Sequence, residues 1–428
     1  MTDLDFTIDA LGEGRYASPM RASQFVAAGD EVLYHGNLAA IQPYLARGER
    51  PPAFELAGPR RDLFFQPGTD LRAGIVTCGG LCPGMNDVIR AVVLSLTYHY
   101  GVQTIYGFRY GYEGLNLTLG HRPLLLTPEL VERISTLGGT LLGTSRGEQS
   151  VPLMVDALVE YGVNMLFTVG GDGTLRGAQA IAAEIARRGL PIAVVGIPKT
   201  IDNDIAFIEK TFGFETAVAV AQQVVEGAHV EAIAARNGVG LVKLMGRDSG
   251  FIPAYTTLAD SRVNFCLTPE SPFALEALRE ALRVRLALRH HAVIVVAEGA
   301  GQDLMAGERN RDASGNVLHQ DIGLFLRDAM RAYFRELDVE LNLKYIDPSY
   351  AIRNVPANTA DSAFCLLLGH NAVHAAMAGR TNMVVGNWRG QFTHVPIHAA
   401  VAQRKKIDPA GWLWNAVLAS TGQPHPLV

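Results

Sequence analysis

From residue 71 onward, short apolar runs rich in β-branched residues alternate with longer amphipathic stretches. Each run has the length of a buried strand and is followed closely by a glycine, which is typical of parallel strands that end in turns. The runs are Ala73–Thr77, Met165–Val169, Ile192–Val195, Gly240–Leu244 and Ala292–Ala297. This alternation predicts an α/β fold with two Rossmann-like lobes, in which parallel-rich sheets are flanked by helices.

The amphipathic stretches predict the helices between these strands. Asn86 is the expected N-cap of one helix, and Thr174 is the expected N-cap of another that ends before Gly189. Longer helical patterns cover residues 214–235 and 275–288. Their apolar stripes predict core faces and carry no chemistry.

Residues 1–70 lack this regular pattern. They contain Pro43, Pro51, Pro52 and Pro59 and show no sustained helical or strand period. We therefore expect an N-terminal extension of short elements that packs on the main body.

Composition excludes several classes of protein. The 428 residues are 48% hydrophobic, and 37 basic and 42 acidic residues give a net charge of −5, so we expect no nucleic-acid partner. There is no run of 18 apolar residues and no signal pattern at the N-terminus, which predicts a cytoplasmic protein without a membrane partner. The four cysteines lack zinc-ligand spacing and are expected to be thiols. The basic cluster at residues 404–406 is interpreted as a solvated surface turn.

Candidate chemistry is concentrated in two glycine-rich turns, Gly-Gly-Asp-Gly-Thr at residues 170–174 and Pro-Lys-Thr-Ile-Asp-Asn-Asp at 198–204. Each follows a predicted strand, where open α/β sheets bind ligands. Glycines let backbone N–H groups approach an anion, while Asp172, Asp202 and Asp204 could serve a divalent cation and a proton acceptor. The pattern favours phosphoryl transfer over an ordinary Asx-rich turn.

Two further turns could contact phosphate. Residues 78–86, Cys-Gly-Gly-Leu-Cys-Pro-Gly-Met-Asn, suit a terminal phosphate, although a tight turn that needs glycine is an equal alternative. This turn is not a P-loop, because no Gly-Lys-Ser/Thr follows. Arg146 lies among small residues at 143–147 and could bind phosphate oxygens, although alone it is better explained as a surface arginine.

Later turns carry residues suited to a sugar phosphate. Arg247 lies in Met-Gly-Arg-Asp-Ser-Gly, Glu298 follows a predicted strand, and Arg353 ends the segment that begins at Tyr345. Either arginine could bind a phosphate, and Glu298 could accept hydrogen bonds from sugar hydroxyls. Each residue alone could equally belong to an ordinary salt bridge.

In their order from about residue 74 to 396, these motifs resemble those of the 6-phosphofructokinase family. The most specific are Pro-Lys-Thr-Ile-Asp-Asn-Asp and Met-Gly-Arg-x-Ser-Gly. The resemblance implies transfer of a phosphoryl group from ATP to O1 of fructose 6-phosphate with Mg²⁺, giving fructose 1,6-bisphosphate in glycolysis. It also implies a homo-oligomer, either a tetramer or a dimer.

The resemblance also implies roles for individual residues. Asp202 corresponds to the general base, assisted by Thr200, Lys199 and Arg247, and Asp172 serves Mg²⁺. The donor site implied is Gly80, Arg146, Gly171, Asp172, Gly173, Thr174 and Gly177. The acceptor site implied is Thr200, Asp202, Asp204, Met245, Gly246, Arg247, Glu298, Lys344, Tyr350 and Arg353.

The same resemblance divides the chain into lobes. Residues 71–213 and 352–400 are expected to form the donor-binding lobe, and residues 214–351 the lobe for fructose 6-phosphate. Residues 1–70 are the N-terminal extension and 401–428 a C-terminal segment.

The sequence departs from the family pattern at three positions. Bacterial ATP enzymes of the family have His where Tyr350 stands and Arg where Lys344 stands. Many also have an Arg at the position of Gly238, which reaches a neighbouring subunit's substrate. Either another cation, for which the nearby Lys243 is a candidate, replaces that arginine, or the contact is absent.

The donor is ambiguous, because Gly173 matches ATP-using members while Lys199 matches pyrophosphate-using ones. A carboxylate at position 173 would repel a nucleotide phosphate, whereas the lysine charge suits either donor. The combination resembles the long ATP-dependent branch of plants and trypanosomatids, so we expect ATP.

Three alternatives stay open. Pyrophosphate as the donor keeps the fold and changes only the substrate. An NAD or lipid kinase would share the turn at 170–174 but would not need the sugar-site motifs. A non-catalytic regulatory subunit is disfavoured by the intact Asp172, Thr200, Asp202 and Arg247.

Overall fold

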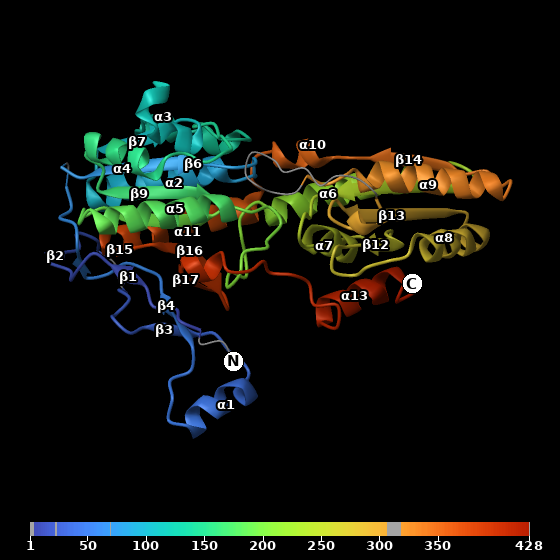
Figure 1. Cartoon of the computed structure of the whole chain (residues 1–428), viewed down its shortest axis with the longest axis horizontal. Coiled ribbons are helices and arrows are strands. Elements are labelled where there is room, and N and C mark those ends of the chain that lie inside the picture. The colour runs from blue at the N-terminus through green and yellow to red at the C-terminus, as the bar shows by residue number, and fades with distance from the viewer. Residues whose placement is uncertain (1–3, 22–23, 69, 306–317, 428) are drawn as a thin grey trace. The chain divides into compact units, whose positions relative to one another are not determined.

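The computed structural model describes residues 4–21, 24–68, 70–305 and 318–427 and divides into two compact units. Unit 1 comprises residues 1–200, 205–213 and 355–403, and unit 2 comprises residues 201–204, 214–354 and 404–428. Figure 1 shows the helices and strands with their labels. The predicted α/β fold, with parallel-rich sheets flanked by helices, is confirmed.

Unit 1 contains a nine-stranded sheet in the order β3-β4-β17-β16-β10-β9-β6-β7-β8. Its five central strands, from β16 to β7, run parallel, and antiparallel strands extend both edges. Its strands are β3 (Glu31–Leu33), β4 (Ala53–Leu56), β6 (Arg72–Thr77), β7 (Thr104–Phe108), β8 (Leu124–Leu125), β9 (Met165–Gly170), β10 (Ala193–Pro198), β16 (Met383–Trp388) and β17 (Gln391–Pro396). Every residue of β9 and β10 is buried, as expected for central strands covered on both faces.

The helices of unit 1 cover this sheet. They are α1 (Leu38–Ala46), α2 (Met85–Tyr100), α3 (Pro128–Val131), α4 (Val151–Glu160), α5 (Asp172–Arg187), α11 (Thr359–Met377) and α12 (Ile397–Ala400), with 3₁₀ turns at Gly111–Leu115, Leu117–Leu119 and Ile134–Thr136. Helices α2 and α11 pack against each other, whereas α5 lies on β9 and β10 beside α4. Leu175, Ile181 and Ile185 of α5 are buried in this core.

Unit 2 contains a four-stranded, fully parallel sheet in the order β12-β13-β11-β14. Its strands are β11 (Gly238–Leu244), β12 (Phe265–Leu267), β13 (His291–Ala297) and β14 (Asn342–Ile346). Its helices are α6 (Phe214–Ile233), α7 (Phe251–Ala259), α8 (Leu275–Arg289), α9 (Ile322–Glu336), α10 (Ser349–Arg353) and α13 (Trp412–Thr421), with a 3₁₀ turn at Gln302–Leu304. The predicted helices over 214–235 and 275–288 are confirmed as α6 and α8, and Leu278, Leu282 and Leu286 line the core.

The N-terminal residues add strands to unit 1. Strand β1 (Asp9–Ala10) pairs with β15 (Arg380–Thr381), β2 (Tyr16–Ala17) pairs with β5 (Asp62–Leu63), and β4 pairs with β17. Glu55 of β4 lies 2.8 Å from Arg380, 3.1 Å from Arg60 and 2.7 Å from Nδ1 of His394. Although burial alone would raise the pKa of Glu55, the hydrogen bond from His394 and the arginine charges hold it at about 2. This cluster therefore ties the N-terminal strands to the sheet.

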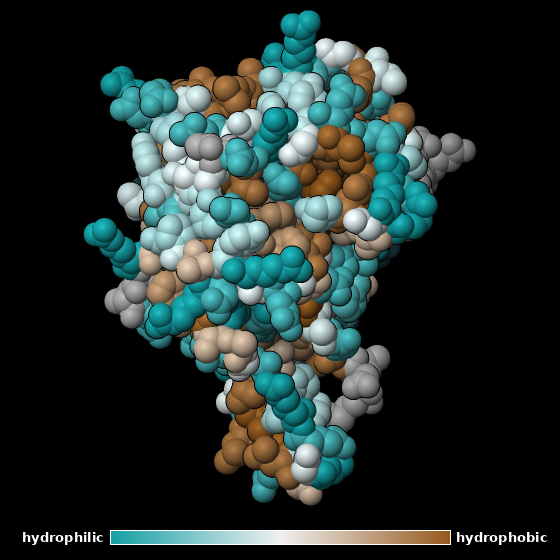
Figure 2. All heavy atoms as spheres, turned by 90° about the vertical axis from the view of Figure 1, so that its left-hand side faces the viewer, coloured by the Kyte–Doolittle hydropathy of each residue, from teal (hydrophilic) through white to brown (hydrophobic). Residues whose placement is uncertain are grey.

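Helix α1 does not pack into a core, because none of its residues is buried. Leu38 is 72% exposed and Leu45 is 59% exposed. In Figure 2, hydrophobic side chains gather at the bottom of the view, at the height of α1 in Figure 1. Over the residues that the structure describes, no helix is both long enough and apolar enough to span a membrane.

Both predicted helix caps are wrong. Helix α2 begins at Met85 after Gly84, which has a φ of 100°, and helix α5 begins at Asp172 after Gly171. Asn86 instead lies inside α2, where its side chain donates to the Leu137 carbonyl (3.0 Å) and accepts from the Leu141 N–H (2.8 Å). Each helix thus begins directly at its glycine-rich turn, α2 two residues and α5 three residues earlier than expected.

Candidate functional site

The two acidic glycine-rich turns lie at the carboxyl ends of neighbouring strands. Strands β9 and β10 pair with Gly170 opposite Pro198, and the Lys199 N–H donates to the Gly170 carbonyl at 3.0 Å. A Cβ atom on Gly171 would lie 3.2 Å from the Lys199 carbonyl oxygen, so this close approach leaves little room for a side chain. The parallel register thus places both motifs at one edge of the unit 1 sheet.

The buried Lys199 side chain reaches the turn after β6. Its Nζ donates to the Gly80 carbonyl at 2.9 Å. Gly79 has a φ of 82°, and a Cβ atom there would lie 3.3 Å from the same ammonium. Glycine is therefore needed here both for the left-handed backbone and for the lysine that lies against it.

The loop that carries Arg146 is held against the same turn. The Thr144 hydroxyl donates to the Gly79 carbonyl at 2.6 Å, and the Gly79 N–H donates to the Ser145 carbonyl at 3.3 Å. Arg146 itself is exposed. Unit 1 therefore brings Gly80, Lys199 and the Arg146 loop to one edge of its sheet.

The first turn of α5 carries the remaining donor-site candidates. Asp172 is half-buried and forms an ion pair with Arg176, whose Nε lies 3.1 Å from its carboxylate. A Cβ atom on Gly173 would meet nothing within 4 Å, so this face is open. At Gly177 it would lie 2.6 Å from the Tyr112 ring, so that glycine has a packing reason of its own.

Asp172 has the oxygen ligands that suit Mg²⁺, which is commonly held by one or two carboxylates together with substrate phosphates. Within the part of the chain that the structure describes, no three His, Cys, Asp or Glu side chains form a group that could hold a metal by themselves. The residues therefore suit a metal that arrives with a phosphate donor. They do not form a permanent protein site that would hold a metal alone.

In unit 2, Asp202 and Asp204 lie among other charged groups. The Asp204 carboxylate forms an ion pair with Arg404 at 3.0 Å, and its carbonyl accepts from the Lys405 N–H at 2.8 Å. The pKa of Asp202 is raised well above its ordinary value, first by burial and then by the negative charges of Asp204 and Glu298. A backbone hydrogen bond from Arg247 and the charge of Arg404 oppose this rise. A carboxyl with a raised pKa in a charged site is a candidate proton acceptor.

Arg247 and Glu298 lie on adjoining turns after β11 and β13. The Glu298 N–H donates to the Leu244 carbonyl at 2.9 Å, and the Gly299 N–H donates to the Gly246 carbonyl at 3.0 Å. A Cβ atom on Gly299 would collide with the backbone of Arg247. The buried Met245 and Gly246 fix the same turn, so unit 2 brings Asp202, Asp204, Arg247 and Glu298 together.

Tyr350 and Arg353 lie on the short helix α10. The guanidinium of Arg353 stacks over the Tyr350 ring at 5.1 Å from its centroid, and Tyr350 is 77% exposed. Lys344 is exposed on β14, opposite Gly240, and no hydrogen bond or ion pair described for unit 2 joins it to the other candidates. The stacked pair therefore presents a cation and a hydroxyl near each other, whereas Lys344 stands apart.

The structure also explains two features that the sequence left open. Gly238 has no room for an arginine, because a Cβ atom there would collide with the carbonyl of Ala232 at the end of α6. Lys243 is not available as a replacement, since its ammonium lies 2.7 Å from Asp321 and 2.9 Å from Asp347.

Sequence reasoning missed two residues. Arg404, interpreted as part of a solvated turn, is half-buried and pairs with Asp204. His319 lies near Arg247 and Glu298, and its pKa is lowered by burial and by the arginine charge. The amide of Gln302 donates to the carbonyls of Glu298 (2.8 Å) and of Gln320 (3.0 Å), the residue after His319. No motif marks either residue.

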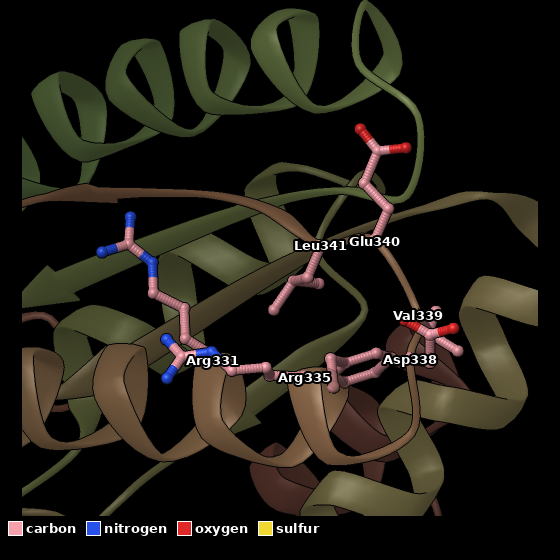
Figure 3. Close-up of a pocket in the computed structure, with 7 residues that line it drawn as sticks. Arg331, Arg335, Asp338, Val339, Glu340 and Leu341 are labelled. Atoms are coloured by element: carbon pink, nitrogen blue, oxygen red, sulfur yellow. The ribbon is translucent and has the colours of Figure 1, made fainter.

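A cavity of about 540 Å³ lies elsewhere in unit 2. Its lining is Arg331, Phe334, Arg335, Asp338, Val339, Glu340 and Leu341. Figure 3 shows these side chains at the end of α9 and in the segment that leads into β14. Because α10 follows the opposite end of β14, this cavity is separate from the acceptor-site candidates.

Comparison with known proteins defines the class. A family model described as "Phosphofructokinase" matches residues 72–376, and the chain belongs to the phosphofructokinase family. It is 47% identical to the ATP-dependent 6-phosphofructokinase of Borreliella burgdorferi, over 99% of this chain and 97% of that protein. It is 49% identical to the ATP-dependent 6-phosphofructokinase of Trypanoplasma borreli, over 96% of this chain and 86% of that protein.

Among solved structures, the pyrophosphate-dependent phosphofructokinase of Marinobacter aquaeolei superposes with a TM-score of 0.69. It is 19% identical, and the match covers 83% of this chain and 92% of that chain. At this identity the likeness confirms the phosphofructokinase fold and carries no information about the donor.

Proposed function

We propose that this chain is an ATP-dependent 6-phosphofructokinase, which transfers the γ-phosphoryl group of ATP to O1 of fructose 6-phosphate. The observation that carries the proposal is its similarity, over nearly its full length, to two relatives with this name at 47% and 49% identity. The open first turn of α5 at Gly173 supports a nucleotide donor.

Unit 1 binds the donor. Backbone N–H groups of Gly171, Gly173 and Thr174 at the start of α5 suit phosphate oxygens, since a helix N-terminus attracts anions. Gly80 and Arg146 lie on the two turns that meet beside Lys199. When bound, Mg²⁺ would neutralise charge on the donor phosphates beside Asp172.

Unit 2 binds and activates the acceptor. Asp202 accepts the proton of the attacking O1 hydroxyl, and because burial and the neighbouring carboxylates raise its pKa, its carboxylate is a stronger base. Asp204 and Arg404 hold the adjoining charge, while Arg247, Glu298, Tyr350 and Arg353 bind the sugar phosphate. Thr200 and Lys199 support the transferring phosphoryl group, the latter through its positive charge.

The second candidate donor is pyrophosphate, and one observation is compatible with it. The Lys199 ammonium is buried against Gly80, where it would face a phosphate of either donor. The open space at Gly173 favours ATP, because pyrophosphate has no nucleotide to place there.

The test is identification of the product. Purified protein with ATP, Mg²⁺ and fructose 6-phosphate should form fructose 1,6-bisphosphate, with the new phosphate on O1 by ³¹P NMR. Removal of Mg²⁺ by EDTA should abolish the reaction and an excess of Mg²⁺ should restore it. Phosphorylation at another position, or no product under these conditions, would contradict the proposal.

Two further expectations stay predictions. Assembly into a homotetramer or dimer is tested by light scattering of the purified protein. A cytoplasmic location is tested by fractionation of the source cells.

A further inference from the structure

One ammonium group in unit 2 joins two carboxylates from different segments. Lys243 lies on β11, and its side chain is only 11% exposed. Its Nζ lies 2.7 Å from Oδ2 of Asp321 and 2.9 Å from Oδ2 of Asp347. Burial alone would lower the pKa of Lys243, but its hydrogen bonds to the two carboxylates outweigh burial and raise it. The Lys243 side chain therefore stays positively charged at any ordinary pH.

Asp321 connects this ammonium to helix α9. Its Oδ1 accepts the Leu324 N–H at 3.0 Å, which makes it the N-cap of the helix. The Tyr345 hydroxyl, from β14, donates to the same carboxylate at 3.0 Å. One end of the Lys243 bridge is thus held by a helix terminus and a neighbouring strand.

Asp347 connects the ammonium to helix α10. Its Oδ1 accepts from the Ser349 N–H at 3.1 Å and from the Ser349 hydroxyl at 2.5 Å. These bonds set the turn from β14 into α10, which carries the stacked pair of Tyr350 and Arg353. The position of that pair therefore depends on where Asp347 is held.

We propose that Lys243 is a positioning residue for the acceptor site, which fixes the turn before α10 and thereby places Arg353 and Tyr350. The inference rests on the proposed function, since the acceptor role of that pair is itself proposed. Without the ammonium, which lies 2.7 Å from Asp321 and 2.9 Å from Asp347, the two carboxylates would face each other and repel. The turn would move outward, and a shift of about 1 Å in a group that positions the substrate can lower the reaction rate by up to about 100-fold.

The experiment compares Lys243→Met with Lys406→Met, which removes a lysine from an exposed position of the same unit. Lys243→Met should raise the KM for fructose 6-phosphate by about tenfold or more, while the KM for ATP and kcat stay within about threefold. Lys406→Met should leave all three constants unchanged. Deuterium exchange of residues 345–354 in the ligand-free protein should be faster in Lys243→Met alone.

A double variant separates positioning from direct contact. Asp347→Asn keeps the side-chain oxygen that accepts from Ser349 and removes the repelling charge, so Lys243→Met with Asp347→Asn should recover part of the lost affinity. If Lys243 itself touched the substrate, the double variant would recover nothing and the exchange rate of residues 345–354 would not change. Either result, or an unchanged KM in Lys243→Met, overturns the inference.

The exchange measurement needs no substrate. Wild-type protein that fails to phosphorylate fructose 6-phosphate would refute the proposed function, whereas unchanged exchange in Lys243→Met would refute the positioning role alone.

Discussion

Replacement of Gly173 by Asp tests the donor site with little risk to the fold. Gly173 is the second residue of α5, and a Cβ atom there meets nothing within 4 Å. Gly173→Ala, the matched control, should stabilise the helix by up to about 1 kcal/mol. An aspartate in the first turn should add about 0.3–1 kcal/mol through the helix dipole. Both variants should therefore melt at or above the wild-type Tm.

The expected loss comes from charge. A carboxylate roughly 5 Å from a nucleotide phosphate is repelled by about 3 kcal/mol at an effective dielectric constant of about 20. Because position 173 is exposed, solvent screening should reduce this to about 1–2 kcal/mol, which is roughly 5- to 30-fold in affinity. Gly173→Asp should raise the KM for ATP by that factor, and added salt should diminish the effect.

The assay is steady-state kinetics with ATP varied at saturating fructose 6-phosphate, at low salt and at about 0.5 M KCl. Gly173→Ala should keep the KM for ATP within about twofold of the wild type, since it adds volume without charge. An equal increase in the KM for ATP in both variants would mean that the added side-chain volume, and not the charge, weakens ATP binding. No loss in Gly173→Asp would mean that the first turn of α5 does not face the nucleotide, and the donor site would be wrong.

Four further variants test the acceptor site and the N-terminal strands. Asp202→Asn should lower kcat by about 10²–10⁴-fold at unchanged Tm, whereas near-normal turnover would remove its role as base. Arg353→Ala should raise the KM for fructose 6-phosphate by about 10- to 150-fold and leave that for ATP unchanged, and equal losses would make it structural. Glu298→Gln removes a negative charge that raises the pKa of Asp202, so the acidic limb of the pH profile of kcat/KM should shift to lower pH. An acidic limb at the same pH would mean that Glu298 does not influence the pKa of the base. Glu55 has its pKa lowered to about 2 from an ordinary 4.5, so its stabilisation is present above pH 4.5 and is lost as the pH falls toward 2. Glu55→Gln should accordingly have a lower Tm than the wild type at pH 7, and this difference in Tm should become smaller near pH 2. A difference in Tm that is the same at both pH values would mean that ionisation of Glu55 does not stabilise the fold.

The sequence predicted the central architecture because long periodic patterns survive tertiary packing. The buried runs at 165–169 and 292–297 became β9 and β13, and the helical stripe at 275–288 became α8. The antiparallel additions were not predicted, since β1, β2 and β5 are two residues long and carry no period. Such strands are specified by pairing with distant residues, which a single sequence does not display.

The site was predictable in part for the same reason. Compact motifs made Asp172, Asp202 and Arg247 candidates, but the ionic contacts around the acidic turn and around Lys243 join residues that lie far apart in the sequence. Arg404 reaches Asp204 across 200 residues, and Lys243 finds its two carboxylates on segments 78 and 104 positions away. Only the folded chain shows that Arg404 and Lys405, from the basic cluster, contact Asp204.

The central claim is the identity of the reaction, and a two-donor assay tests it most directly. Wild-type protein is given fructose 6-phosphate and Mg²⁺ with either ATP or pyrophosphate at equal concentration, and fructose 1,6-bisphosphate is measured, with Asp202→Asn as the catalytic control. We predict much faster turnover with ATP than with pyrophosphate, and loss of both in the control. Faster turnover with pyrophosphate would contradict the assignment of the donor and make Lys199, rather than Gly173, the residue that reports it.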